Sequence, residues 1–130
     1  MGKVVNTSRQ PNIGELLNKN VILELDSLTN ADKTLIIESL LLWIHHYRLA
    51  QPLRETFKHA IIIEEAHHIL LKQAGGRKET ITDTILREIR ELGEAIILID
   101  QHPSLISIPA LGNSYTTITL NLKHLSLIHI

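Results

Sequence analysis

The chain has 130 residues, no cysteine and a formal net charge of −1 at pH 7. Its length predicts one domain, and its 44% of hydrophobic residues can form a core, which excludes intrinsic disorder. The lack of cysteine excludes a disulfide scaffold and thiol catalysis, and the near-zero charge means that nucleic-acid binding would need a local basic patch or an assembly.

The first 20 residues are polar and contain Pro11 and Gly14, so we expect residues 1–20 to lead into a domain formed by residues 21–130. The short apolar run Val21–Leu25 is followed by turn-forming residues and predicts a strand.

A helix is predicted to begin near Thr29 or Asn30, either of which can cap it, and to end at Gln51-Pro52. Its apolar residues surround most of the cylinder, so we expect neighbours to cover this helix on more than one side. The most apolar part, residues 35–44, is far shorter than the ~20 residues that span a bilayer. We therefore expect a cytoplasmic protein with no membrane partner.

Two later runs, Ala60–Ile63 and Ala95–Ile99, are short and continuously apolar. This pattern is typical of strands in a parallel sheet that is covered on both faces. Between them, Thr80 predicts the start of a helix that Gly93 ends, with Asp83 completing a capping box.

A last strand is expected over Thr116–Leu122. The alternation of strands and helices along the chain predicts an α/β fold, with a mainly parallel sheet flanked by helices.

Polar residues follow both apolar strands. Glu64 and Glu65 come after the first strand, and Asp100 and Gln101 come after the second. Because ligands bind at the carboxyl ends of strands in open α/β sheets, we expect these side chains to share one crevice. There, one carboxylate can hold Mg²⁺, another can activate water and an amide can contact a terminal phosphate. A solvated strand end is the simpler alternative.

The segment His59–His67, with its Glu-Glu-Ala-His ending, resembles the Walker B strand of the HerA/FtsK branch of RecA-like P-loop ATPases. Residues 86–103, in which an arginine-bearing helix leads through Gly93 to a strand and then Gln101, resemble the next block of that family. The resemblance covers roughly residues 21–123, and related ATPases of conjugative transfer are similar too.

The resemblance implies a three-layer RecA-like fold and an ATP-driven DNA translocase or helicase of the HerA type. Such proteins work with ATP and Mg²⁺ on double-stranded DNA, as hexameric rings and often beside a nuclease. Carried over by position, Glu64 is the magnesium-side carboxylate, Glu65 the catalytic carboxylate and Gln101 the γ-phosphate sensor. Arg90 matches the arginine that completes a neighbouring subunit's site, and we expect it and Arg87 to face outward.

The chain departs from the family in one respect, because it contains no G-x-x-x-x-G-K-[ST] motif. The nearest glycine and lysine cluster, residues 75–80, has the wrong spacing. We therefore expect the chain to be the C-terminal portion of a longer ATPase and to be inactive by itself. Without the P-loop strand, the strand over residues 95–99 would keep an unpaired edge that self-association could cover.

Two other functions stay open. The first is a catalytically inactive ATPase-like module that binds a partner or DNA through basic residues at positions 72, 77, 78 and 87, although the few aromatic residues disfavour base stacking. The second is a metal site, in which a helical continuation brings Glu64, Glu65 and His68 together. Neither H-E-x-x-H nor its inverted form is present.

Overall fold

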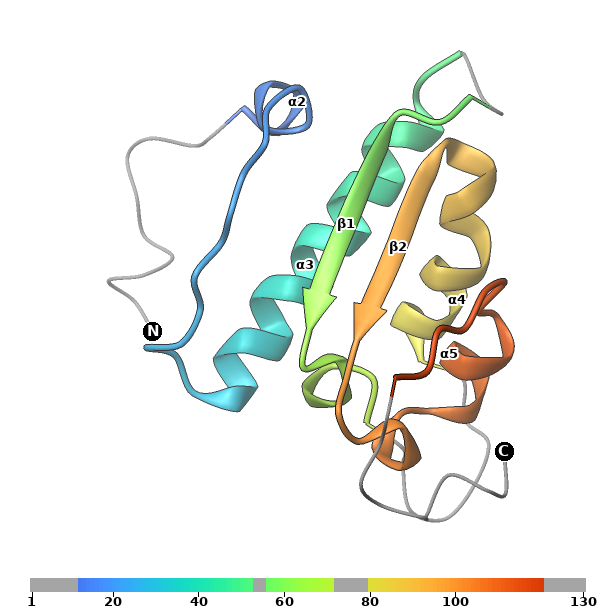
Figure 1. Cartoon of the computed structure of the whole chain (residues 1–130). Coiled ribbons are helices and arrows are strands. Elements are labelled where there is room, and N and C mark those ends of the chain that lie inside the picture. The colour runs from blue at the N-terminus through green and yellow to red at the C-terminus, as the bar shows by residue number, and fades with distance from the viewer. Residues whose placement is uncertain (1–11, 53–55, 72–79, 121–130) are drawn as a thin grey trace.

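The computed structural model describes residues 12–52, 56–71 and 80–120, shown in colour in Figure 1. The expectations for residues 1–11, for the basic loop around position 77 and for the chain from position 121 onward lie outside these ranges. The elements are α2 (Ile13–Leu16), α3 (Asn30–Leu49), β1 (His59–Glu64), a 3₁₀ helix (Ala66–His68), α4 (Ile81–Glu88), a 3₁₀ helix (Ile89–Leu92), β2 (Glu94–Ile99), a 3₁₀ helix (Pro103–Leu105) and α5 (Ile108–Gly112).

Strands β1 and β2 lie side by side and run in the same direction (Figure 1). The register pairs His59 with Glu94 at the start and Glu64 with Ile99 at the end. A helical connection through α4 joins them, as parallel strands require. The predicted α/β class and the parallel pairing of these two runs are confirmed.

Helices α3 and α4 pack on one face of this sheet (Figure 1). Alternate strand residues point toward them, because successive side chains of a strand face opposite sides. The core contains aliphatic side chains from both strands, both helices and the 3₁₀ helix that follows α4: Leu41, Ile44, Ile61, Ile63, Ile85, Ile89, Ile96 and Leu98.

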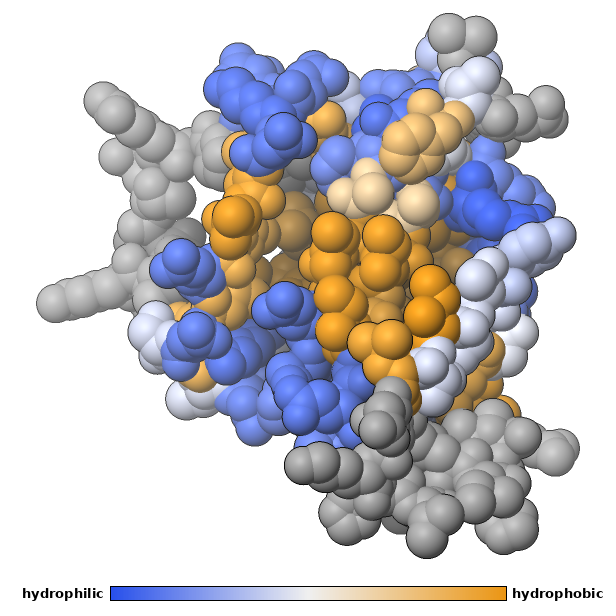
Figure 2. All heavy atoms as spheres, viewed as in Figure 1, coloured by the Kyte–Doolittle hydropathy of each residue, from blue (hydrophilic) through white to orange (hydrophobic). Residues whose placement is uncertain are grey.

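The opposite face of the sheet is apolar and open in the described part of the chain. Ile62, Ile97 and Ile99 are 61%, 47% and 48% exposed, and Figure 2 shows a continuous hydrophobic patch on the face of the molecule where the two strands lie. The expectation of a sheet covered on both faces is therefore wrong for the described residues. Continuous hydrophobicity specifies two apolar faces, but it does not supply the second layer.

Helix α3 begins as predicted, since the Thr29 side chain accepts a hydrogen bond from the backbone N–H of Asp32. Its buried residues are spaced as one stripe at positions 41, 44, 45 and 48, whereas Leu35 and Trp43 are exposed. The expectation of cover on more than one side is thus wrong within the described ranges. Among the helices of those ranges, α3 included, none has the length and apolarity needed to cross a membrane.

The two flanking strands expected from the sequence are not formed. Residues 21–25 are irregular, with Ile22 exposed, and residues 116–120 are irregular, with Ile118 exposed; positions 121 and 122 lie outside the described residues. A short apolar run becomes a strand only when it pairs with an edge, and the described sheet contains β1 and β2 alone.

A buried ion pair joins α3 to the first residue of β2. Arg48 Nε donates a hydrogen bond to Glu94 Oε1, and His59 Nδ1 lies 2.9 Å from Glu94 Oε2. Glu94 is only 1% exposed, so its carboxylate oxygens are paired with these partners rather than with water. The pair holds the amino ends of both strands against the helix.

The Glu94→Gln variant should lose about 3–5 kcal/mol of unfolding free energy, because it leaves the buried guanidinium of Arg48 without its counter-charge. Urea denaturation measures this loss, and Glu91→Gln, at an exposed position of the same segment, is the control. Equal stability of the two variants would contradict a structural role for the pair.

The capping box of α4 is present as predicted, and its aspartate also contacts Ser107, the residue that caps α5. The carboxylate of Asp83 accepts hydrogen bonds from the backbone and hydroxyl of Thr80 and, at 2.8 Å, from the hydroxyl of Ser107. Burial alone would raise the pKa of Asp83, but these hydrogen bonds outweigh it and lower the pKa. Gly93 ends the following 3₁₀ helix with φ 86°, the left-handed conformation expected there.

Because the pKa of Asp83 is lower in the folded state, its carboxylate stabilises the fold fully above the unfolded-state pKa, and this contribution is lost as the pH falls below about 4. The Asp83→Asn variant should therefore be less stable at pH 7, by about 1–3 kcal/mol, and lose less stability on acidification. Urea denaturation at pH 7 and pH 3 tests this, with Asp26→Asn at an exposed position as the control. A parallel acid loss in wild type and Asp83→Asn would refute it.

Candidate functional site

The carboxyl ends of β1 and β2 meet at one edge of the sheet, as the sequence predicted. Glu65 lies just past the end of β1 and Gln101 just past the end of β2. The side-chain amide of Gln101 donates a hydrogen bond of 3.3 Å to Glu65 Oε1. The parallel register causes this proximity, because Glu64 and Ile99 lie opposite each other as the last paired residues.

Glu65 changes the direction of the chain directly after β1. It has φ 49° and ψ 49°, and it is the one non-glycine residue with positive φ in the described part of the chain. This left-handed conformation costs a side-chain-bearing residue about 1–2 kcal/mol. The turn buries Ala66 completely and directs His67 toward the end of β2.

Asp100 connects the two loops that follow the strands. Its Oδ2 accepts a hydrogen bond of 2.7 Å from the backbone N–H of His67 and lies 2.8 Å from His67 Nδ1. Its Oδ1 accepts a hydrogen bond of 2.5 Å from the backbone N–H of His102. The Asp100 and His67 side chains are 4% and 13% exposed. Asp100 thus joins the two loops, and we call this set of hydrogen bonds the Asp100 bracket.

The electrostatics of Asp100 match this role. Burial by itself would raise its pKa, but hydrogen bonds from the backbone N–H groups of His102 and His67, together with the His67 ring and its positive charge, lower the pKa overall. The carboxylate is therefore ionised at neutral pH, with both of its oxygens engaged by the two loops.

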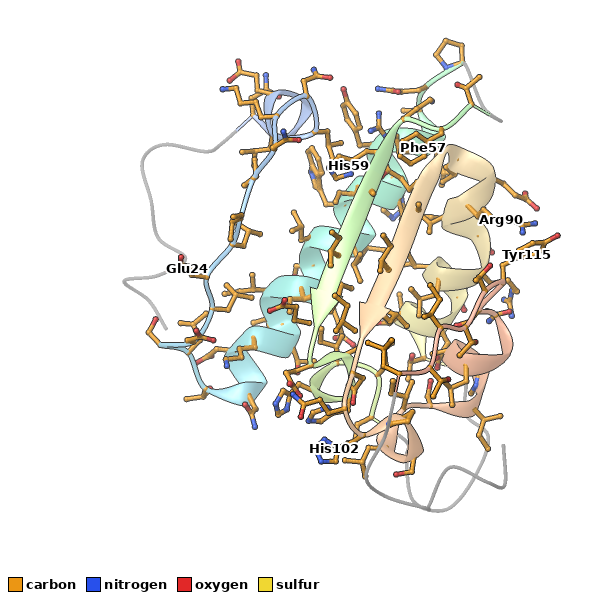
Figure 3. The ribbon with its side chains drawn as sticks, in the orientation of Figure 1. Glu24, Phe57, His59, Arg90, His102 and Tyr115 are labelled. Carbon is orange, nitrogen blue, oxygen red and sulfur yellow. The ribbon has the colours of Figure 1, made fainter. Side chains whose placement is uncertain are left out.

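Four side chains form what we call the strand-end cluster: Glu65, His67, Asp100 and His102. One donor atom from each lies within 4.8 Å of all the others. Glu65 Oε2 is 3.5 Å from His67 Nδ1, and the His67 and His102 rings meet edge to face, 5.5 Å apart. Figure 3 labels His102 beside this end of the sheet.

The cluster differs from the metal-ligand set expected from the sequence, which was Glu64, Glu65 and His68. It is the one such group in the part of the chain that the structure describes, and it contains neither Glu64 nor His68. The cause is local: the segment after Glu65 is a single 3₁₀ turn rather than an α-helix, and it leaves His68 exposed.

Sequence reasoning missed the two histidines of the cluster, although a signal was available. His67 and His102 each follow the last residue of their strand by three positions, and those last residues are paired in the sheet. In a parallel pair, residues at equal distances beyond the paired ends lie at the same end of the sheet. The equal spacing could therefore have indicated that His67 and His102 lie close together.

Arg90 is not brought to this site within the chain. It is exposed on the 3₁₀ helix before β2, toward the start of that strand, and its guanidinium lies 5.1 Å from the centre of the Tyr115 ring (Figure 3). Arg87 is exposed too. The expectation that both arginines face outward is confirmed.

The strand edge thus presents carboxylates, imidazoles and an amide in an open position. Such a set can bind a cation, polarise a water molecule or contact a phosphate oxygen. Comparison of the chain with family models, curated proteins and solved structures finds no match.

If Asp100 brackets the two loops, the Asp100→Ala variant should expose the backbone N–H groups of His67 and His102. Hydrogen bonds to a charged acceptor contribute about 1.5–3 kcal/mol, so amide exchange at both positions should accelerate by about 10–100-fold. Residue-resolved hydrogen exchange measures this, with Gln101→Ala as the control at the neighbouring position. Unchanged exchange in Asp100→Ala would contradict the bracket.

Proposed function

We propose that this chain carries the Walker B and sensor portions of a HerA-like, RecA-type ATPase. In this proposal it hydrolyses ATP with Mg²⁺ together with a P-loop supplied from outside these 130 residues. The observation that carries the proposal is the contact between Gln101 Nε2 and Glu65 Oε1, made between the ends of two adjacent parallel strands. The order of the motifs along the chain and the position of this contact at the strand ends agree with a site for phosphoryl transfer.

The proposed roles follow from where each side chain stands. Glu64, exposed at the end of β1, provides the carboxylate on the magnesium side. Glu65, turned by its left-handed backbone and half exposed, is placed to polarise an attacking water. The Gln101 amide, already directed toward Glu65, would contact the terminal phosphate oxygen. ATP bound with Mg²⁺ supplies the electrophilic phosphorus.

The open face of the sheet supports the finer fold proposal. A RecA-like domain has helices on both faces of its sheet, whereas the described residues cover one face and leave Ile62, Ile97 and Ile99 exposed. An apolar face of this kind is suited to a further layer, because burial of aliphatic surface is favourable by about 25 cal/mol per Å². We propose that the three-layer arrangement is completed by the portion that carries the P-loop.

The assembly and the substrate are part of the same proposal. Arg90 is exposed and precedes the amino end of β2, whereas Glu65 follows the carboxyl end of β1, so we assign it to the nucleotide of a neighbouring subunit, which is the arrangement of a ring. A hexameric translocase or helicase acting on DNA, with a nuclease as a possible companion, is the activity that the resemblance suggests. The inactive DNA-binding or interaction module is the competing function.

The coding DNA upstream of Met1 distinguishes these two functions. An in-frame G-x-x-x-x-G-K-[ST] on a strand–loop–helix pattern supports the ATPase. A start at Met1, with no such loop in a companion gene, would remove ATP hydrolysis and favour the binding module, as would DNA binding by this chain without nucleotide.

In the complete ATPase, Glu65→Gln should lower turnover by about 10²–10⁴-fold, because the amide cannot accept a proton from water, and should leave nucleotide binding unchanged. Steady-state hydrolysis and equilibrium binding of ATP measure the two effects. Glu24→Gln, at an exposed position far from the strand ends (Figure 3), is the control. Turnover retained by Glu65→Gln would exclude the proposed role of this carboxylate.

Rings mixed from wild-type and Arg90→Ala subunits test the arginine separately. Activity should fall more steeply than the fraction of variant subunits, because each variant impairs its neighbour. A strictly proportional loss would indicate that Arg90 acts only within its own chain.

A further inference from the structure

We infer that the strand-end cluster of Glu65, His67, Asp100 and His102 is a binding site for a divalent transition-metal ion of the zinc class. This goes beyond the proposed function, which requires only Mg²⁺ bound with nucleotide. The inference starts from the convergence of four donor atoms within 4.8 Å, contributed by two loops that the parallel sheet holds side by side.

The donor set decides which ions fit. Two imidazole nitrogens and two carboxylate oxygens suit Zn²⁺, Co²⁺ and similar first-row ions. Mg²⁺ prefers an octahedral shell of oxygen atoms and retains its water, so the histidines disfavour it. With neutral imidazoles, two carboxylates supply a charge of −2, which balances a divalent cation.

The geometry is close to what a tetrahedral ion needs. Bonds of about 2.0–2.2 Å place neighbouring ligand atoms about 3.3–3.6 Å apart. The distance of 3.5 Å between Glu65 Oε2 and His67 Nδ1 already falls in this range. Donors at the 4.8 Å limit must come about 1 Å closer, whereas His67 Nδ1 and Asp100 Oδ2, which lie 2.8 Å apart, must separate by about 0.5 Å.

The cluster combines two fixed members with two that can move. His67 and Asp100 are mostly buried and lie 2.8 Å apart, so both are held beside the site before an ion binds and need only a small separation to reach ligand spacing. Glu65 is 46% exposed and His102 is exposed, so rotation of their side chains can close the site. A bound ion would replace the proton held between the His67 ring and the Asp100 carboxylate.

The test is titration of the untagged 130-residue chain with Co²⁺, followed by visible absorption. We expect the intense absorption of tetrahedral Co²⁺, its loss when Zn²⁺ displaces the probe, and no displacement by excess Mg²⁺. His102→Ala and Glu65→Gln should each weaken Co²⁺ binding by more than about 10–100-fold, because the loss of an outer-shell partner alone weakens metal binding by about that factor. Both positions are exposed enough for the fold to persist, which circular dichroism checks.

His46→Ala is the matched control, because His46 is an exposed histidine on α3 that lies outside the cluster. It should bind Co²⁺ like the wild type. Weak absorption of octahedral type, equal affinity in His102→Ala and the wild type, or an equal loss in His46→Ala would each overturn the inference and indicate adventitious binding to other histidines. The titration uses no nucleotide, so its outcome is independent of whether the ATPase proposal holds.

Discussion

The in-register parallel pairing of β1 with β2 is the constraint on which the rest of the structure depends. It places Glu64 opposite Ile99, so that both chains leave the sheet at one edge and their following residues converge. Gln101 reaches Glu65 only because of this register. A shift by one residue would turn the aliphatic side chains that pack on α3 and α4 to the open face, and would separate the two loops.

Each end of the sheet is secured by a charged group that is hidden from solvent. At the amino end, Glu94 joins β2 to Arg48 of α3 and to His59 of β1. At the carboxyl end, Asp100 binds the backbone of both loops. The first group is wholly structural, whereas the second lies within a cluster whose outer members reach solvent. The same bracket that stabilises the loops therefore also arranges the donors for a ligand.

Local signals in the sequence predicted the helices and strands that depend on local chemistry. Thr29 and Thr80 cap helices where they were expected to, and Gly93 adopts the left-handed conformation at the predicted stop. The predictions for Val21–Leu25 and for the strand beginning at Thr116 failed in the described residues. Pairing of such runs depends on a neighbouring edge, which no local pattern encodes.

The sequence by itself determined the α/β class, the two apolar strands and the position of Glu64, Glu65, Asp100 and Gln101 at their ends, because capping, turn chemistry and hydrophobic runs act over a few residues. Only the tertiary structure decided that Asp100 is engaged by both loops, that His67 and His102 rather than His68 complete the cluster, and that one sheet face stays open. These features depend on the single 3₁₀ turn after Glu65 and on contacts between residues more than thirty positions apart, and side-chain direction at such distances is set by packing.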